Sequence, residues 1–248
     1  MMKKEIDMKK FLALLLAVVM ILSLAACGKA ASKDIFAKGE GVLTHEQYIA
    51  AEEGARVTVE AFVQGHQSWW DGKITVYAED KDGGYFFYDM ACSEADAAKL
   101  VPGTKIKVTG DKGVWAGEVE IMDGSFEFEE GSYVAPALDI GKMLGTDELE
   151  SHMNQFICVK DAKIAAKGDG VAFFYNWDGS GSDGDDLYFD IEINGGTYTF
   201  VVRRYLTAPG SEVYEAVKNL QVGQTVDIEG FLYWYEGPQP HISAITVK

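Results

Sequence analysis

The strongest constraint on the fold is a spacing pattern that occurs twice, once after Leu100 and again after Leu220. In both copies, glycine follows the leucine by three, ten and seventeen positions, apolar residues by six and eight, and an aromatic residue by fifteen. The matching pairs are Gly103 and Gly223, Ile106 and Val226, Val108 and Ile228, Gly110 and Gly230, Trp115 and Tyr235, and Gly117 and Gly237. A Trp-Asp-Gly triplet also occurs twice, at residues 70–72 and 177–179. Repetition at fixed offsets indicates an internal duplication.

The residues around these markers predict the same order of elements in each half. Alternation of apolar and polar residues predicts strands, and Ser or Thr before a short run of helical period predicts a helix start. The first half is expected to form a capped helix from Thr44, strands at 57–61, 74–76 and 85–90, a helix from Ser93, and strands at 105–115 and 118–128. The second half is expected to form a short helix from Thr146, strands at 156–165, 187–193 and 197–204, a helix at 211–220, and strands at 225–235 and 241–247.

This order of three strands, a short helix and two strands, with glycine in the fourth strand, resembles the OB-fold, a five-stranded Greek-key barrel. The resemblance covers residues 55–130 and 155–248, and it implies an all-β chain with short helices and two tandem OB-fold-like barrels. We expect a first OB-like domain at 44–130, a linker at 131–145 and a second OB-like domain at 146–248.

The N-terminal residues have the pattern of a secretory signal peptide. Four lysines and two acids in residues 1–10 precede an unbroken apolar run, Phe11 to Leu22, and then the tetrapeptide Leu24-Ala25-Ala26-Cys27. A charged segment, an apolar segment and a small-residue cleavage site define such a signal, and the apolar run is shorter than the roughly 20 residues of a spanning helix. Met8 is an equally good start, because it opens a complete signal by itself.

The tetrapeptide resembles the lipobox of bacterial lipoproteins, which implies cleavage after residue 26 and diacylglycerol on the sulfur of Cys27. Residues 1–26 are then the signal peptide, residues 27–43 a tether, and membrane lipid the first partner, on the extracytoplasmic face of the cell membrane. The chain also resembles tandem OB-like lipoproteins of gut-type Gram-positive bacteria. That likeness implies a cellular location and a fold but no activity.

The charge of the mature chain argues against nucleic acid. The chain has 22 Lys and Arg and 39 Asp and Glu, and removal of residues 1–26 takes away four lysines and two acids. The remaining 18 basic and 37 acidic residues give a net charge of −19 over 222 residues. Because neutralisation of phosphates by Lys and Arg supplies most nonspecific affinity for DNA, this balance opposes that partner.

No catalytic arrangement is present, so we expect no enzyme activity. The histidines at 45, 66, 152 and 241 show no ligand spacing, and no nucleophile elbow, zincin motif or phosphate loop occurs. Besides Cys27, only Cys92 and Cys158 remain, and two thiols so far apart in sequence favour separate buried thiols over a bridge.

Aromatic residues near the predicted loops between the first and second strands of each barrel form the most specific candidate site. The segments are 66–71, with Trp69 and Trp70, and 173–178, with Tyr175 and Trp177. Flat rings beside amide and carboxylate groups suit stacking on sugars or bases, and OB-folds bind ligands across this loop and the second and third strands. The alternative is that these rings, together with Trp115 and the run 233–235, plug a barrel end or the interface between the barrels.

Three further patterns favour structural roles. The glycine-rich loop 176–186 has oxygen-bearing side chains at alternating positions, so Asp178, Asp183 and Asp185 are weak candidate calcium ligands. However, Leu187 stands where an EF-hand needs glutamate. We therefore expect no cofactor. Lysines at 105, 107 and 112 are expected to pair across strands with acids at 118 and 120, and arginines at 203 and 204 to face opposite sides of one strand.

Together these observations predict a non-enzymatic surface lipoprotein that recognises an extracellular glycan or peptide through its aromatic loops. Two alternatives remain open: an OB-fold lipoprotein that binds single-stranded nucleic acid, and a structural or adaptor lipoprotein of an envelope complex.

Overall fold

The structure is a computed structural model that describes residues 34–248. The predicted signal segment, its predicted cleavage site and Cys27 lie outside the described residues. Residues Lys38–Lys248 form one compact unit that contains both barrels. Within the described part of the chain, no helix is long and apolar enough to cross a membrane.

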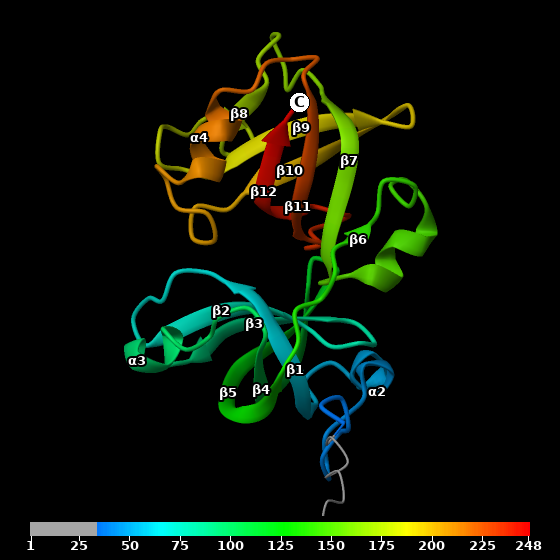
Figure 1. The fold of residues 1–248 in the computed structure, drawn as a ribbon, viewed down its shortest axis with the longest axis vertical. Helices are drawn as coiled ribbons and strands as arrows, with labels where there is room; N and C mark the ends of the chain where they lie inside the picture. The colour runs from blue at the N-terminus through cyan, green and yellow to red at the C-terminus, as the bar shows by residue number, and fades with distance from the viewer. Residues whose placement is uncertain (1–33) are drawn as a thin grey trace, which may run out of the picture. The chain divides into compact units, whose positions relative to one another are not determined.

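The first barrel, drawn from cyan to green in Figure 1, is closed by five strands in the order β1-β2-β3-β5-β4. The strands are β1 (Arg56–His66), β2 (Lys73–Glu79), β3 (Gly84–Ala91), β4 (Thr104–Trp115) and β5 (Glu118–Ser132). All pairings are antiparallel except β3 with β5. Helix α2 (His45–Ala50) precedes the barrel, and α3 (Glu94–Ala97) connects β3 to β4.

The second barrel repeats this arrangement. Its elements are β6 (Leu138–Asp139), the 3₁₀ helix η1 (Asp147–His152), β7 (Phe156–Ile164), β8 (Phe173–Tyr175), β9 (Leu187–Ile193), β10 (Gly196–Val202), α4 (Glu212–Lys218), β11 (Thr225–Phe231) and β12 (His241–Val247). The sheet order is β6-β7-β11-β12-β10-β9-β8, and an additional β7–β9 pairing closes the five central strands into a ring. Strands β10 and β12 are parallel, as β3 and β5 are. The predicted all-β fold with two five-stranded OB-like barrels is therefore confirmed.

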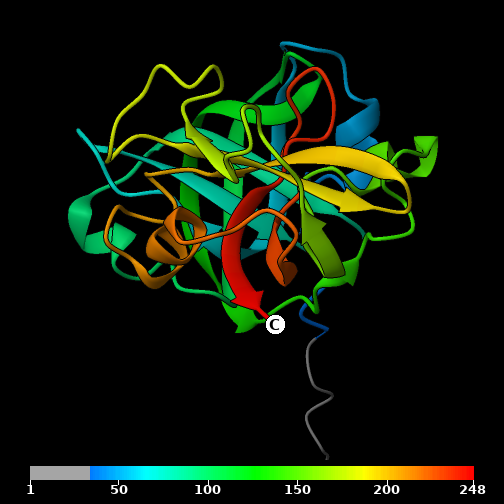
Figure 2. The same cartoon turned by 90° about the horizontal axis from the view of Figure 1, so that it is seen from above.

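Local sequence explains how these elements begin. Thr44 forms the predicted capping box with Gln47, and Ser93 and Ser211 each accept a hydrogen bond from the backbone N–H three residues later. Each oxygen satisfies a donor that the first helical turn leaves free. Helix α4, orange in Figure 2, packs against β12, β9 and β10.

Each barrel has its own apolar core, because alternate residues of each strand point inward. The first core includes Val57, Val59, Val76, Phe87, Ile106 and Val108. The second includes Ile157, Val159, Phe189, Phe200, Val226 and Ile228.

The duplicated glycines at 110 and 230 stand at equivalent bulges. The register shifts between Thr109 and Asp111 in one barrel and between Glu229 and Gly230 in the other. A Cβ on Gly230 would lie 2.3 Å from the carbonyl oxygen of His241, and one on Gly110 would lie 2.7 Å from that of Met122. Only glycine lets the fifth strand approach the fourth so closely, which explains why both copies keep it.

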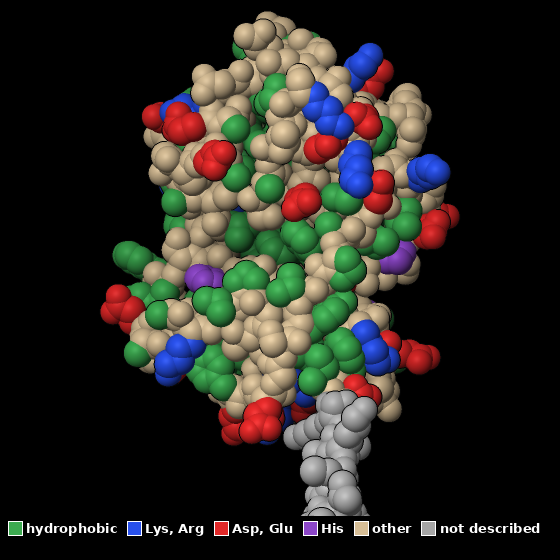
Figure 3. Space-filling view, viewed as in Figure 1, with side chains coloured by type: hydrophobic (Ala, Val, Ile, Leu, Met, Phe, Trp, Pro, Cys, Tyr) green, Lys and Arg blue, Asp and Glu red, His purple; other side chains and the backbone are tan. Residues whose placement is uncertain are grey.

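A third apolar cluster is formed by both barrels together. Tyr77 and Phe86 of the first barrel pack with Phe231 of the second, and the rings of Tyr77 and Phe231 stack at 4.4 Å. Hydrophobic side chains gather across the middle of the face shown in Figure 3.

Two buried carboxyl groups of the first barrel bind backbone groups of the second. Glu79 Oε2 accepts from the N–H of Phe156 at 2.7 Å, and Glu118 Oε2 accepts from the N–H of Trp234 at 2.8 Å. Glu118 is completely buried. These bonds and the shared apolar cluster join the two barrels.

Two expectations about strands are wrong. Strand β11 ends at Phe231 and not at 235, because the following backbone turns away and binds Glu118 and the carbonyl oxygen of Ala116. The predicted pairing of lysines with the acids at 118 and 120 does not form, because the register places Glu118 opposite Trp115 and Glu120 opposite Gly113. Instead, Lys105 pairs with Glu60 at 2.7 Å, Lys107 pairs with Glu127 at 2.7 Å, and Lys112 donates to the carbonyl oxygens of Ile49 and Ala51.

Candidate functional site

A cleft of about 1190 Å³ is lined by residues of both barrels. Its first wall is the outer surface of β2, β3 and β5, where alternation turns Lys73, Thr75, Tyr88, Glu120 and Met122 away from the core. One end of that surface is covered by the shared apolar cluster. The other end is open and forms the cleft.

The second wall comes from the corresponding part of the second barrel. Tyr188 on β9 and His241 on β12 line it, as does Arg203, the first residue after β10. In strand order, β9, β10 and β12 are the counterparts of β2, β3 and β5. The cleft therefore lies between equivalent surfaces of the two copies.

Loops of both barrels complete the cleft. The loop between the first and second strands contributes Trp70 in one barrel and Trp177 in the other, and the turn between the fourth and fifth strands contributes Trp115 and Tyr235. These are the two aromatic positions that the duplicated sequence repeats.

The rings at the mouth of the cleft are exposed. Trp70 is 79 % exposed, Trp177 73 % and Trp115 62 %, and the rings of Tyr88, Tyr205 and Tyr235 are each exposed by nearly half. Exposed tryptophan rings lack the burial that normally stabilises such large apolar side chains, so their convergence makes this cleft the candidate binding surface.

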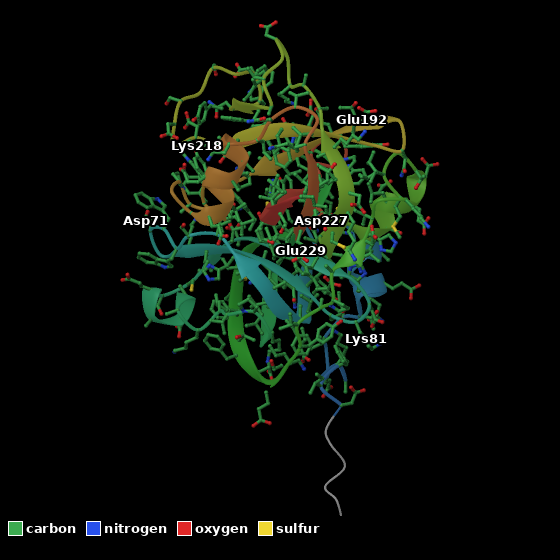
Figure 4. The ribbon with its side chains drawn as sticks, turned by 45° about the horizontal axis from the view of Figure 1, so that its top comes forward. Asp71, Lys81, Glu192, Lys218, Asp227 and Glu229 are labelled. Atoms are coloured by element: carbon green, nitrogen blue, oxygen red, sulfur yellow. The ribbon has the colours of Figure 1, made fainter. Side chains whose placement is uncertain are left out.

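A tight turn presents the first of these rings. Trp70 and Lys73 exchange backbone hydrogen bonds of 2.9 and 3.0 Å across Asp71 and Gly72, which both have positive φ. Asp-Gly in this conformation is typical of a type I′ hairpin turn. Figure 4 shows Asp71 at this turn, on the outside of the barrel.

The structure separates the four predicted ligand-binding residues into two pairs. Trp70 and Trp177 line the cleft. Trp69 packs against the first core, and its indole N–H donates to the carbonyl oxygen of Cys92 at 2.8 Å. Tyr175 lies on β8 and packs against the second core. Trp69 and Tyr175 therefore occupy structural positions, as the alternative interpretation of the aromatic segments predicts.

Sequence reasoning did not single out Glu120, Arg203, Tyr205 or His241 as site residues. Trp115 and Tyr235 carried a usable signal, because both stand fifteen positions after the repeated leucine. The two arginines do not face opposite sides of a strand, because β10 ends at Val202. Arg203 pairs with Asp186 at 2.6 Å, and Arg204 pairs with Asp185 at 3.0 Å.

Burial controls the charges inside the cleft. Desolvation, assisted by the charge of Asp89, raises the pKa of Glu120 to about 7. Desolvation and the neighbouring Arg203 lower the pKa of His241 well below its ordinary value, so the imidazole is neutral. Lys73 lies 3.5 Å from Asp89. The two cations that line the cleft, Lys73 and Arg203, are thus both paired with carboxylates.

The three weak candidate calcium ligands, Asp178, Asp183 and Asp185, form other interactions. Asp183 pairs with Lys218 of α4, which Figure 4 labels, at 2.9 Å. Asp185 pairs with Arg204, and Asp178 accepts from the backbone N–H of Ser180 at 3.0 Å. Residues 34–248 contain no group of three or more His, Cys, Asp or Glu side chains placed to hold a metal ion.

The two thiols are free and buried, as predicted. Cys92 belongs to the first barrel and Cys158 to the second. Burial raises the pKa of both thiols, which disfavours the reactive thiolate.

No protein family model and no curated protein matches the sequence. Among solved structures, the tetrameric p202 HIN2 domain is similar with a TM-score of 0.34 and 13 % identity, over 79 % of this chain and 96 % of that one. The Ifi202 HINa domain in complex with 20-bp double-stranded DNA has a TM-score of 0.34 and 12 % identity, over 77 % and 94 %. A replication protein A heterotrimer bound to single-stranded DNA has a TM-score of 0.32 and 11 % identity, over 78 % of this chain and 49 % of that one. Likenesses this distant carry no argument about function.

Proposed function

We propose that this protein is a non-enzymatic, lipid-anchored binding protein of the bacterial cell surface, and that its cleft binds an extracellular glycan. The observation that carries the proposal is the convergence of exposed rings from equivalent loops of both barrels on one cleft. Tryptophan faces stack well on the apolar faces of sugar rings, with polar neighbours fixing orientation. Amide groups of Gln67 and Gln239 and the hydroxyl of Thr75 line the same cleft.

The charges of the cleft support a neutral ligand. Asp89, Glu120 and Glu236 line it, and its two cations are already paired with carboxylates. A phosphate backbone entering the cleft would meet this negative charge and release few counterions.

Single-stranded nucleic acid is the second candidate, because the same rings can stack on bases. The OB-fold is also used by proteins that bind oligonucleotides and oligosaccharides. The −19 charge of the mature chain and the pairing of the cleft cations both oppose this candidate.

A mixed array of oligosaccharides and oligonucleotides tests the proposal. The mature chain from residue 27, with Cys27→Ser to keep it soluble, should bind neutral oligosaccharides, and the affinity should change less than about twofold between 50 and 500 mM salt. Nucleic-acid binding falls steeply with salt, by about a thousandfold or more for six to ten phosphate contacts. Oligonucleotide binding that collapses with salt, without any oligosaccharide binding, would replace the glycan by the second candidate.

The lipid anchor is tested separately in the cell. Because the lipid would be attached through the Cys27 sulfur, Cys27→Ser should move the protein from the membrane fraction to the soluble fraction and leave its melting temperature unchanged. Ser23→Ala, in the same segment, is the matched control and should stay with the membrane. Retention of the Cys27→Ser protein on membranes after a salt wash would show that Cys27 does not anchor the protein.

A further inference from the structure

We propose that the floor of the cleft recognises a neutral, polyhydroxylated ring, whose hydroxyl groups donate to the Glu120 carboxylate and accept from the Nε2–H of His241. This inference rests on the proposed function and names the chemical class of the ligand. It comes from two side chains, one from each barrel, that line the same cleft and have unused hydrogen-bonding capacity.

The proton on His241 is placed by its neighbours. Gln67 Nε2 donates to the hydroxyl oxygen of Tyr77 at 3.1 Å, and that oxygen lies 2.7 Å from His241 Nδ1. Because Nδ1 is the only acceptor that the described residues place within hydrogen-bond distance of the Tyr77 hydroxyl, we assign that hydroxyl as the donor to Nδ1. A neutral imidazole that accepts at Nδ1 carries its hydrogen on Nε2.

That Nε2–H has no acceptor. His241 is 3 % exposed, and its Nε2 has no hydrogen-bond partner among the described residues. The Nε of Arg203, on the same wall, is also buried without an acceptor in this part of the chain. Buried donors without partners are rare in folded proteins, because a donor removed from water without an acceptor destabilises the fold. An oxygen of a bound ligand would satisfy these groups.

Glu120 has the complementary capacity. It is 5 % exposed, and neither of its carboxylate oxygens receives a hydrogen bond from residues 34–248. The ring of Tyr233 stacks on His241 at 4.2 Å and packs on the ring of Phe86 at 5.2 Å, and Phe86 is paired with Glu120 across β3 and β5. Tyr233 therefore connects the wall that carries the acceptor to the wall that carries the donors.

Only a ligand group that both donates and accepts hydrogen bonds satisfies both Glu120 and His241, the two residues that form the floor of the cleft. A carboxylate or phosphate would accept from His241 but meet the charges of Glu120 and Asp89, and an ammonium group would suit Glu120 but leave His241 without an acceptor. Adjacent hydroxyl groups of a neutral sugar do both, and the rings at the mouth would stack on the rest of the chain.

Two substitutions test the pair. His241→Asn keeps an oxygen near the position of Nδ1, for Tyr77, and removes the Nε2–H, and Glu120→Gln removes the negative acceptor with little change in shape. Glu127→Gln, an exposed carboxylate on the same strand β5 that does not line the cleft, is the matched control. The probes are hexasaccharides of glucose, mannose and galactose, with oligogalacturonate and a chitosan hexamer as anionic and cationic counterparts.

For the neutral hexasaccharide that binds best, each of the two variants should lose about tenfold in affinity, while the control should change less than about twofold. Oligogalacturonate and chitosan should bind more weakly than that neutral chain. If neutral chains bind but both variants keep full affinity, or if a charged chain binds more tightly, this inference fails and the glycan-binding proposal stands. If no oligosaccharide binds, the proposed function itself fails. A thermal melt of each variant separates lost contacts from lost folding, and Glu120→Gln decides the question if His241→Asn unfolds.

Discussion

The free energy of unfolding should fall as the pH rises from about 5 to about 8, and Glu118→Gln should remove much of that fall. Burial raises the pKa of Glu118 to about 8, although the side chain of Asn154 and the N–H of Trp234 favour its charged form. Glu118 Oε1 and Asn154 Oδ1 are both buried acceptors without a donor among the described residues. A proton on Glu118 supplies a donor in that region.

The sign follows from where each state holds this proton. Unfolded glutamate releases it near pH 4.5, whereas the folded protein keeps it until about pH 8. Between these values the folded state binds more protons, so stability is greatest at the acidic end of the window and is lost as the pH rises. At about 1.4 kcal/mol per unit of pKa shift, the loss is on the order of 2–5 kcal/mol. Glu79 and Glu120, with pKa values of about 7, contribute in the same direction.

Urea unfolding of residues 27–248, with Cys27→Ser, at pH 5, 6, 7 and 8 measures this dependence. Glu127→Gln is the control, because that exposed carboxylate pairs with Lys107 and its pKa is lowered. The control should keep the dependence of the parent protein. If the free energy of unfolding of Glu118→Gln depends on pH as steeply as that of the parent protein, Glu118 is not protonated in the folded state.

The barrels could be predicted because their signals are local and periodic. Alternation of apolar residues defines the inward face of each strand, and the duplicated glycines at 110 and 230 mark a bulge that any barrel of this order needs. The short strands β6 and β8 were missed. Strand β8 is formed by three consecutive aromatic residues, which have no polar alternation.

The sequence predicted cleft residues only at aromatic positions that occur in both copies of the duplication. Trp70 and Trp177 stand in the repeated triplet, and both line the cleft. Trp69 and Trp70 are neighbours in sequence, and the turn at Asp71 and Gly72 decides which of them faces outward. That choice depends on backbone conformation and not on residue type.

The chemistry of the floor could not be predicted, because it depends on the packing of one barrel against the other. By alternation, Glu118 and Glu120 point out of their own barrel, and an outward glutamate normally reaches water. Nothing near them in sequence indicates that a loop and a strand more than 110 positions later cover them. The same packing gives His241 its partner, Tyr77.

Trp70→Ala and Trp177→Ala should each weaken ligand binding by about five- to a hundred-and-fifty-fold, since stacking on an aromatic ring contributes roughly 1–3 kcal/mol. Each should change the melting temperature little, because both rings are more than 70 % exposed and their loss leaves no cavity. Trp69→Ala should do the reverse. Its partly buried ring packs against the first core, so truncation should lower the free energy of unfolding, by up to the roughly 3–5 kcal/mol that a fully buried tryptophan contributes.

Isothermal titration of the soluble mature chain with the shortest oligosaccharide that binds tests most directly whether the two barrels form one site. The account predicts one ligand molecule per chain, with the same stoichiometry and weaker affinity in both Trp70→Ala and Trp177→Ala. Two ligand molecules per chain, or full affinity in either variant, would show that the equivalent loops do not share a ligand and would contradict the account.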